Sequence, residues 1–176
     1  MRCFIAVELP ESIKNELKGI QTQARSLDLN ATFPDAENMH LTLVFLGELT
    51  EQQANEAKDK LQQLRVTPFQ VSVRDLGFFP NDQRINVFWA GVESPELVEL
   101  QKRTASALGR QNEKPFSGHI TLARVKTARN LDALRELKEK HDSDDFGAFT
   151  ISAIHFKKST LTPQGPVYED WTVIKL

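Results

Sequence analysis

The sequence predicts one domain of mixed strands and helices that is built from two similar lobes. The chain has 176 residues, of which 40% are hydrophobic and 26% charged, and this composition suits a soluble globular domain with one sizeable core. Each half shows the same order of elements: strand, helix, His-bearing strand, helix, strand. The pattern His-x-Thr-x occurs once in each half, at residues 40–43 and 119–122. We expect approximate halves of 1–78 and 79–176, divided where Gly, Pro, Asn and Asp cluster at residues 77–82.

The elements of the first half follow from alternation, apolar spacing and helix caps. Alternating residues predict the first strand, and Pro10 followed by apolar residues at spacings of three and four predicts an amphipathic helix. A β-rich run that closes at Gly47 predicts the next strand. Thr50 and Gln53 form a capping-box pattern at the start of a second helix. The expected elements are a strand over 2–9, a helix from 10 to about 27, a strand over 40–47, a helix from 50 to about 64 and a strand over 69–76.

The second half repeats this order and adds a closing strand. Ser94 and Pro95 are typical of a helix start, and the Pro- and Gly-rich residues 162–166 are typical of a turn. The expected elements are a strand over 84–92, a helix from 94 to about 108, a strand over 119–125, a helix near 130–141, a strand over about 149–156 and a strand over 167–174.

Composition and missing motifs exclude several classes of function. Lysine and arginine number 22 against 24 acidic residues, so the net charge is −2 and no basic surface for binding along many phosphates is expected. Cys3 is the only cysteine, which excludes an intrachain disulfide and a multi-cysteine zinc site. No apolar run approaches the roughly 18 residues of a membrane span, and no signal-peptide apolar region is present. We therefore expect a cytoplasmic protein with no membrane partner. No nucleotide-binding glycine loop and no HExxH motif occurs, so no cofactor or metal is expected.

The duplicated motif carries the chemistry. Because strand side chains alternate, His40 and Thr42 point to one face while the leucines between them point to the other, and His119 and Thr121 repeat this arrangement. If the lobes pack about a pseudo-twofold axis, the two polar faces meet across a cleft. Displacement at phosphorus needs a base for the attacking oxygen and an acid for the leaving one, and two imidazoles can divide these roles. The threonine hydroxyls could donate hydrogen bonds to phosphate oxygens.

The segments around both motifs resemble a known family. MHLTLVFLGE and GHITLARV are similar to the paired HxTx motifs of the 2H phosphoesterases, in particular the bacterial and archaeal RNA 2′,3′-cyclic phosphodiesterases of the LigT type, once described as 2′-5′ RNA ligases. RCFIAVELP resembles the family's opening strand, and residues 159–168 resemble its closing segment. The resemblance therefore extends over essentially the whole chain.

This resemblance implies a fold, a reaction and residue roles. The implied fold is α+β, with two pseudo-symmetric lobes of mostly antiparallel sheet, helices outside and the active-site groove between the lobes. The implied reaction is hydrolysis of a terminal RNA 2′,3′-cyclic phosphate to a 2′-phosphate without metal, with 2′-5′ ligation as the reverse. His40 would be the proton donor and His119 the proton acceptor, while Thr42 and Thr121 would hold the phosphate. The residues alone leave the acid and base order open, because the two motifs are nearly symmetric.

Other substrates and another class of protein remain as alternatives. The expected partners are RNA ends, tRNA fragments among them, or nucleoside 2′,3′-cyclic phosphates, bound by a monomer. A 2H enzyme could instead act on 2′,5′-linked oligonucleotides or on small cyclic phosphates. A non-catalytic module that binds RNA ends is the alternative from a different class, but intact histidines and threonines at both motifs argue against it.

Two further residues are candidates for substrate binding. Arg124 could contact phosphate, but it lies five positions after His119, so a regular strand places it on the opposite face unless a bulge intervenes. Phe4 lies on the same face of the first strand as Arg2, Ala6 and Glu8, and it could stack on a terminal base. Packing in the core is the competing role. Tyr168 matches the family's closing segment, and packing explains it equally well. His155 is expected to be a surface or packed residue.

Overall fold

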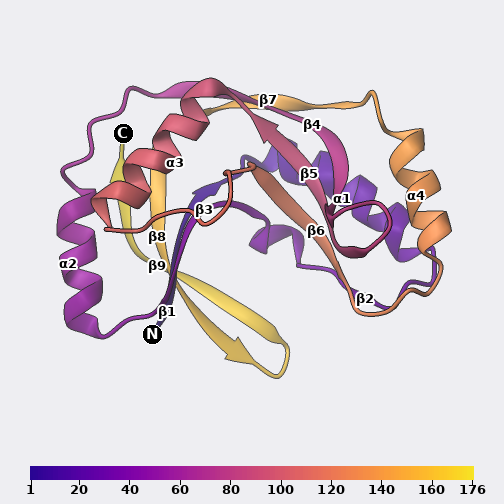
Figure 1. The fold of residues 1–176 in the computed structure, drawn as a ribbon, viewed down its shortest axis with the longest axis horizontal. Coiled ribbons are helices and arrows are strands. Elements are labelled where there is room, and N and C mark those ends of the chain that lie inside the picture. The colour runs from indigo at the N-terminus through magenta and orange to yellow at the C-terminus, as the bar shows by residue number, and fades with distance from the viewer.

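The computed structural model describes all 176 residues, and Figure 1 shows how its helices and strands follow one another along the chain. The elements are β1 (Arg2–Glu8), α1 (Glu11–Arg25), β2 (Ala31–Thr32), the 3-10 helix η1 (Ala36–Asn38), β3 (His40–Glu48), α2 (Glu51–Leu61), β4 (Phe69–Pro80), β5 (Ile85–Glu93), α3 (Pro95–Ala107), β6 (His119–Val125), α4 (Leu131–Lys140), β7 (Asp145–Ile151), β8 (Ala153–Thr162) and β9 (Gly165–Lys175). The expected α+β class is therefore confirmed.

The helices begin where the caps predict. The Thr50 side chain accepts a hydrogen bond from the Gln53 N–H, and the Gln53 side chain accepts one from the Thr50 N–H, which completes a capping box at the start of α2. Ser94 caps α3 through the Leu97 N–H, with Pro95 in the first turn. The apolar positions of α1 are buried from Ile13 onward at helical spacing, so one face of the helix packs on the sheet.

One antiparallel sheet contains the eight long strands, in the order β7-β4-β5-β6-β3-β1-β8-β9, and the short β2 pairs with β6. Its centre is thin, because β3 and β6 share only the pair Leu41 and Ile120. The sheet thus divides into two groups of four strands. We call the group β1, β3, β8 and β9 the His40 lobe, and the group β4, β5, β6 and β7 the His119 lobe.

Each lobe takes elements from both halves of the chain, which differs from the expected division at residues 78 and 79. β4 crosses the expected boundary and pairs with β5 through a tight turn, in which the Asn81 side chain accepts hydrogen bonds from the Gln83 and Arg84 N–H groups. β8 returns to pair with β1. The helices cross over as well, since α1 contacts β6 and β7 while α3 contacts β3.

The strand expected over residues 149–156 is two strands, so that prediction is wrong. β7 ends at Ile151 and pairs with β4, whereas β8 begins at Ala153 and pairs with β1 in the other lobe. The chain must therefore change partners at Ser152. Apolar residues on both sides of the break concealed it in the sequence, because Ile151 and Ile154 are both buried.

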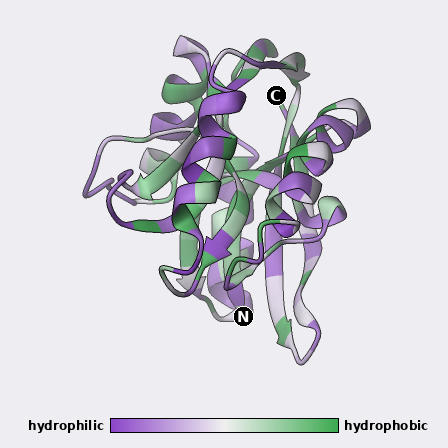
Figure 2. Cartoon of the chain, turned by 90° about the vertical axis from the view of Figure 1, so that its right-hand side faces the viewer, coloured by the Kyte–Doolittle hydropathy of each residue, from purple (hydrophilic) through white to green (hydrophobic).

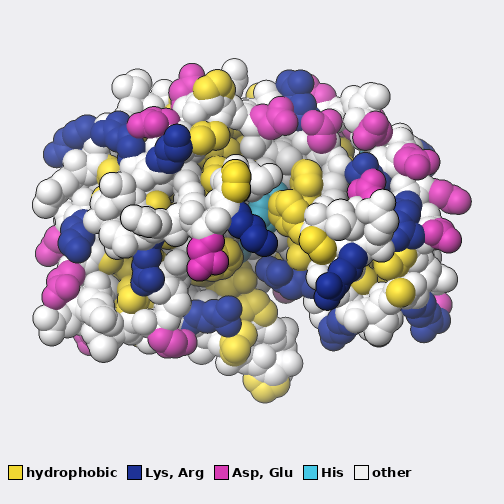
Figure 3. All heavy atoms as spheres, in the orientation of Figure 1, with side chains coloured by type: hydrophobic (Ala, Val, Ile, Leu, Met, Phe, Trp, Pro, Cys, Tyr) yellow, Lys and Arg dark blue, Asp and Glu magenta, His cyan; other side chains and the backbone are white.

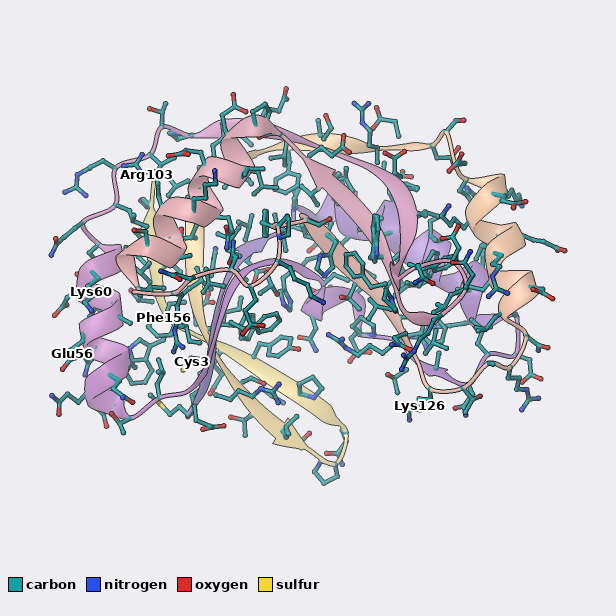
Figure 4. All side chains as sticks on the ribbon, in the orientation of Figure 1. Cys3, Glu56, Lys60, Arg103, Lys126 and Phe156 are labelled. Carbon is teal, nitrogen blue, oxygen red and sulfur yellow. The ribbon has the colours of Figure 1, made fainter.

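A continuous core of 39 buried residues runs through both lobes. Cys3 and Phe156 lie inside this core, whereas Glu56, Lys60 and Arg103 point outward from α2 and α3 (Figure 4). The helices carry hydrophilic residues on their outer sides (Figure 2). No helix combines the length and the apolar character needed to cross a membrane. The β8–β9 hairpin extends beyond the body of the molecule (Figure 1).

Candidate active site

The two motif strands share a bulge at the same position. Between β1 and β3 the register shifts from Ile5–Val44 to Ala6–Thr42, which leaves Leu43 as the extra residue. Between β5 and β6 it shifts from Phe88–Ala123 to Trp89–Thr121, which leaves Leu122 as the extra residue. In each strand the bulge places two successive apolar side chains in the core: Leu43 and Val44, and Leu122 and Ala123.

In each strand the bulge turns the residue after these two buried side chains back to the face that carries His and Thr. In β6 that residue is Arg124, which lines the same groove as His119 and Thr121. In β3 the matching residue is Phe45, which lines the groove with His40 and is 68% exposed. The bulge that the sequence left open for Arg124 is therefore present. Phe45 was missed, although its distance along the chain from His40 equals that of Arg124 from His119.

A single groove of about 930 Å³ brings together all six candidate residues: Phe4, His40, Thr42, His119, Thr121 and Arg124. A histidine is visible near the centre of the molecule, in a hollow beside basic and apolar side chains (Figure 3). The charged residues that line the groove are Arg2, Arg25, Arg124 and Asp35. The groove is therefore locally positive although the chain carries a net charge of −2.

Both imidazoles make the same hydrogen bond to the main chain. The His40 Nδ1 lies 2.7 Å from the Asn38 carbonyl oxygen, and the His119 Nδ1 lies 2.8 Å from the Ser117 carbonyl oxygen. A carbonyl only accepts, so each Nδ1 donates its hydrogen. Each Nε2 can then accept a proton when the ring is neutral and donate one when it is charged. No sequence pattern indicates this contact, because it is made by the main chain two residues before each histidine.

Different rings surround the two imidazoles. The His40 ring lies 5.0 Å from the Phe4 ring and meets Tyr168 edge-on at 5.3 Å. His119 meets Phe79 edge-on at 4.8 Å and lies 6.5 Å from Trp89. Phe4 is only 4% exposed, so most of its surface packs against neighbours such as the His40 and Tyr168 rings.

Burial lowers the pKa of both histidines. At His40, the hydrogen bond to Asn38 and the charge of Glu8 oppose this effect, while Lys157 and Arg124 add to it. At His119, the hydrogen bond to Ser117 opposes it and Arg124 adds to it. Burial, a hydrogen bond to a carbonyl and the charge of Arg124 thus affect the pKa of both histidines. A carboxylate affects only the pKa of His40.

One cluster of side chains outside the groove has a composition that suits metal ligands. A carboxylate oxygen of Glu8, one of Asp170 and a ring nitrogen of His155 lie within 4.8 Å of one another. The Lys157 Nζ, however, lies 2.5 Å from Glu8 and 2.8 Å from Asp170. The ammonium group therefore already pairs with both carboxylates, at the position that a metal ion would need.

The chain is similar to known proteins over nearly its whole length. The family described as LigT like Phosphoesterase matches residues 7–89 and 91–168. The RNA 2′,3′-cyclic phosphodiesterase of Methanothermobacter thermautotrophicus is 35% identical over 184 residues, covering 100% of this chain and 99% of that protein. The enzyme of the same name from Methanocaldococcus jannaschii is 37% identical over 172 residues, covering 96% of this chain and 97% of its own. A crystal structure of a protein from Thermus thermophilus superimposes with a TM-score of 0.83 at 29% identity, covering 100% and 98% of the two chains.

Proposed function

The chain belongs to the LigT-like phosphoesterase family, and we propose that it hydrolyses RNA 2′,3′-cyclic phosphate ends to 2′-phosphates with His40 and His119 as the acid and base. The observation that carries this proposal is the meeting of two His-Thr pairs in one groove, each imidazole held through Nδ1. The names of the curated relatives supply the substrate class.

In the proposed reaction, the neutral His119 takes a proton from water as the water oxygen forms a bond to phosphorus. The bond between phosphorus and the 3′ oxygen breaks, and the protonated His40 gives its proton to that oxygen. The product carries a 2′-phosphate and a free 3′-hydroxyl. Thr42 and Thr121 would donate hydrogen bonds to the non-bridging oxygens. The protonation states of the histidines are exchanged at the end, so the reverse, ligating reaction would use each ring in the opposite role.

Two groove residues are proposed to bind the substrate. Arg124 offers a cation beside both histidines and would contact the phosphate. Phe45 offers an exposed ring on the other lobe and would stack on a base next to the cyclic end. The small exposed fraction of Phe4 favours packing against His40 over stacking on a base. This part of the proposal therefore transfers the stacking role from Phe4 to Phe45.

We further propose that one chain acts alone, in the cytoplasm, on RNA ends that include tRNA fragments. Both histidines come from the same chain, so the groove needs no second copy to complete it. The only cysteine is buried, and burial raises the pKa of the Cys3 thiol, which suits a fold that uses neither disulfide nor thiolate.

The test is an assay with an oligonucleotide that ends in a 2′,3′-cyclic phosphate, in the presence of EDTA. We expect turnover to a 2′-phosphate, which phosphorus NMR distinguishes from a 3′-phosphate. A 2′,5′-linked dinucleotide and a small cyclic phosphate such as ADP-ribose 1″,2″-cyclic phosphate are measured beside it. Faster turnover of either would replace the proposed substrate, and binding without turnover of any of the three would indicate an RNA-end binding module.

A further inference from the structure

A series of alternating charges, in which the two lysines are buried, lies beside His40, and the reaction above does not use it. Lys157 is 7% exposed, and its Nζ lies 2.5 Å from Glu8 and 2.8 Å from Asp170. The second oxygen of Asp170 accepts a hydrogen bond from the His155 Nδ1 at 3.0 Å. Lys14, also 7% exposed, lies 3.9 Å from the other oxygen of Glu8. Glu8 is thus fixed between two buried ammonium groups.

The strand register places Glu8 next to His40. The two residues are directly opposite on the antiparallel strands β1 and β3, so their side chains share a face of the sheet. Lys14 also donates a hydrogen bond to the Glu37 carbonyl at 3.4 Å. Glu37 precedes Asn38, whose carbonyl accepts the hydrogen of the His40 Nδ1. Lys14 therefore contacts both Glu8, which lies beside the His40 ring, and the segment whose carbonyl orients that ring.

His119 has no such neighbour. The residue opposite His119 on β5 is Gly91, which corresponds to Glu8 in the other lobe. A Cβ at Gly91 would lie 2.7 Å from the Arg74 carbonyl oxygen, so the backbone of β4 excludes a side chain there. Phe79 and Trp89 flank the His119 ring, as Phe4 and Tyr168 flank the His40 ring, but no carboxylate lies opposite His119. The two motifs are alike, but the charges beside them are not.

We propose that Glu8, fixed between Lys157 and Lys14, is the positioning residue that gives His40 the acid role and leaves His119 the base role. The inference deepens the proposed function and rests on it. Glu8 does not line the groove, so it acts through His40 and not on the phosphate. A fixed negative charge beside an imidazole favours the protonated ring, which is the form that an acid needs at the start of the reaction.

The charged groups around each ring support this division. Those that act on His40 are Glu8 from β1, Lys157 from β8 and Arg124 from β6. Glu8 raises the pKa of His40 against the lowering by burial and by the two cations. For Lys157, burial alone would lower the pKa, but the hydrogen bonds to Asp170 and Glu8 outweigh it, so the pKa is raised and the ammonium stays charged. Lys157 therefore pairs with Glu8 as a charged ammonium group.

The experiment changes Glu8 to glutamine, which keeps the shape and removes the charge. NMR titration of the ring signals should show a lower pKa for His40 and an unchanged pKa for His119. Since the acid must be protonated, kcat/KM for the cyclic-ended oligonucleotide should fall roughly threefold to tenfold more at about pH 8 than at about pH 5.5. Glu93→Gln is the matched control, because it removes an exposed carboxylate from β5 in the other lobe. It should change neither titration.

A second variant predicts a shift of the opposite sign. Lys157→Met removes a cation beside His40 and leaves Glu8 with Lys14, so the pKa of His40 should rise. A disturbance of the fold would not move the same ring in opposite directions in the two variants. If Glu8→Gln does not fold, Glu8→Asp is titrated instead: it keeps the charge but moves it away from His40, so the pKa of His40 should fall, and no change or a rise overturns the inference.

The outcomes separate this inference from the proposed function. If the wild-type protein hydrolyses the cyclic phosphate and needs both histidines, but Glu8→Gln leaves the His40 titration and the pH profile unchanged, the role of Glu8 is wrong and the reaction stands. If the wild-type protein does not hydrolyse the cyclic phosphate, the proposed function fails, and with it the acid role that Glu8 is inferred to assign.

Discussion

The strands β3 and β6 hold their histidine and threonine side chains in closely similar ways. Each carries His and Thr two residues apart, each has a bulge after the threonine, and each histidine donates from Nδ1 to the carbonyl two residues earlier. They differ in what surrounds those groups. Phe45 corresponds to Arg124, and Glu8 corresponds to Gly91. The common features place two equivalent imidazoles in one groove, and the differences give each imidazole its own charge environment.

A duplicated scaffold therefore need not make duplicate sites. Acid and base catalysis requires one protonated and one neutral group at the same pH, so two identical environments would work against it. Each imidazole has two aromatic neighbours, but a carboxylate lies opposite His40 and a glycine lies opposite His119.

The largest effect is expected from the histidines themselves. His40→Gln and His119→Gln should each lower kcat on the cyclic-ended oligonucleotide by about 10²- to 10⁴-fold, because each removes a proton transfer. A phosphodiester with a nitrophenolate leaving group separates the two roles, since that leaving group needs no acid. His40→Gln should regain activity on this ester relative to the wild type, and His119→Gln should not.

Circular dichroism of both variants serves as the control for folding in that experiment. Equal losses on the two substrates in both variants would contradict the division into acid and base. Recovery by His119→Gln in place of His40→Gln would show that the roles are reversed.

The next effect concerns the two residues that follow the bulges. Arg124→Gln should lower kcat/KM by roughly 10- to 100-fold, because it removes a charge-assisted hydrogen bond to the phosphate. Phe45→Ala should raise KM by a similar or smaller factor with little change in kcat, because base stacking contributes about 1–3 kcal/mol. Steady-state kinetics on an oligonucleotide and on a mononucleoside cyclic phosphate checks both. A loss of the same size for Phe45→Ala on both substrates would contradict stacking on a neighbouring base.

Much of the site followed from the sequence because the reactive side chains lie on strands. Alternation alone placed His40 with Thr42 and His119 with Thr121. The position of Arg124 could not be decided in this way, because one extra residue reverses the face and the sequence does not mark Leu122 as a bulge. Phe45 was missed for the same reason. The roles of these residues stay predictions until the kinetics are measured.

The fold class also followed from the sequence, but the partners of the strands did not. Residues 149–156 have the composition of one strand, and the break at Ser152 exists because β7 and β8 pair with opposite lobes. Likewise, the apolar face of α1 predicts a buried helix and does not specify that it packs on β6 and β7. Such long-range pairings depend on contacts between segments that no local pattern records.

A smaller effect is expected when a side chain is forced into the place that corresponds to Glu8. Gly91→Ala should destabilise the protein by about 1–3 kcal/mol, because the new Cβ would press on the Arg74 carbonyl oxygen. The melting temperature should fall by roughly 2–12 °C. Gly19→Ala is the matched control, since a Cβ there meets nothing within 4 Å in an exposed part of α1. An unchanged melting temperature for Gly91→Ala would show that the His119 lobe could accept a carboxylate after all.

The smallest effect is expected in the dependence of binding on salt. The groove contains three arginines and one acidic residue, Asp35, so few phosphates are neutralised when RNA binds. A plot of log affinity for a single-stranded end against log salt should therefore have a slope of roughly −1 to −2. Arg2 belongs to the His40 lobe and Arg124 to the His119 lobe, and replacing either by glutamine should make the slope less steep by about 0.7. Only the Arg124 variant should also lower kcat, because Arg124 alone of the two affects the histidines. A slope steeper than about −4 would indicate contacts along many phosphates, which the acidic chain outside the groove does not favour.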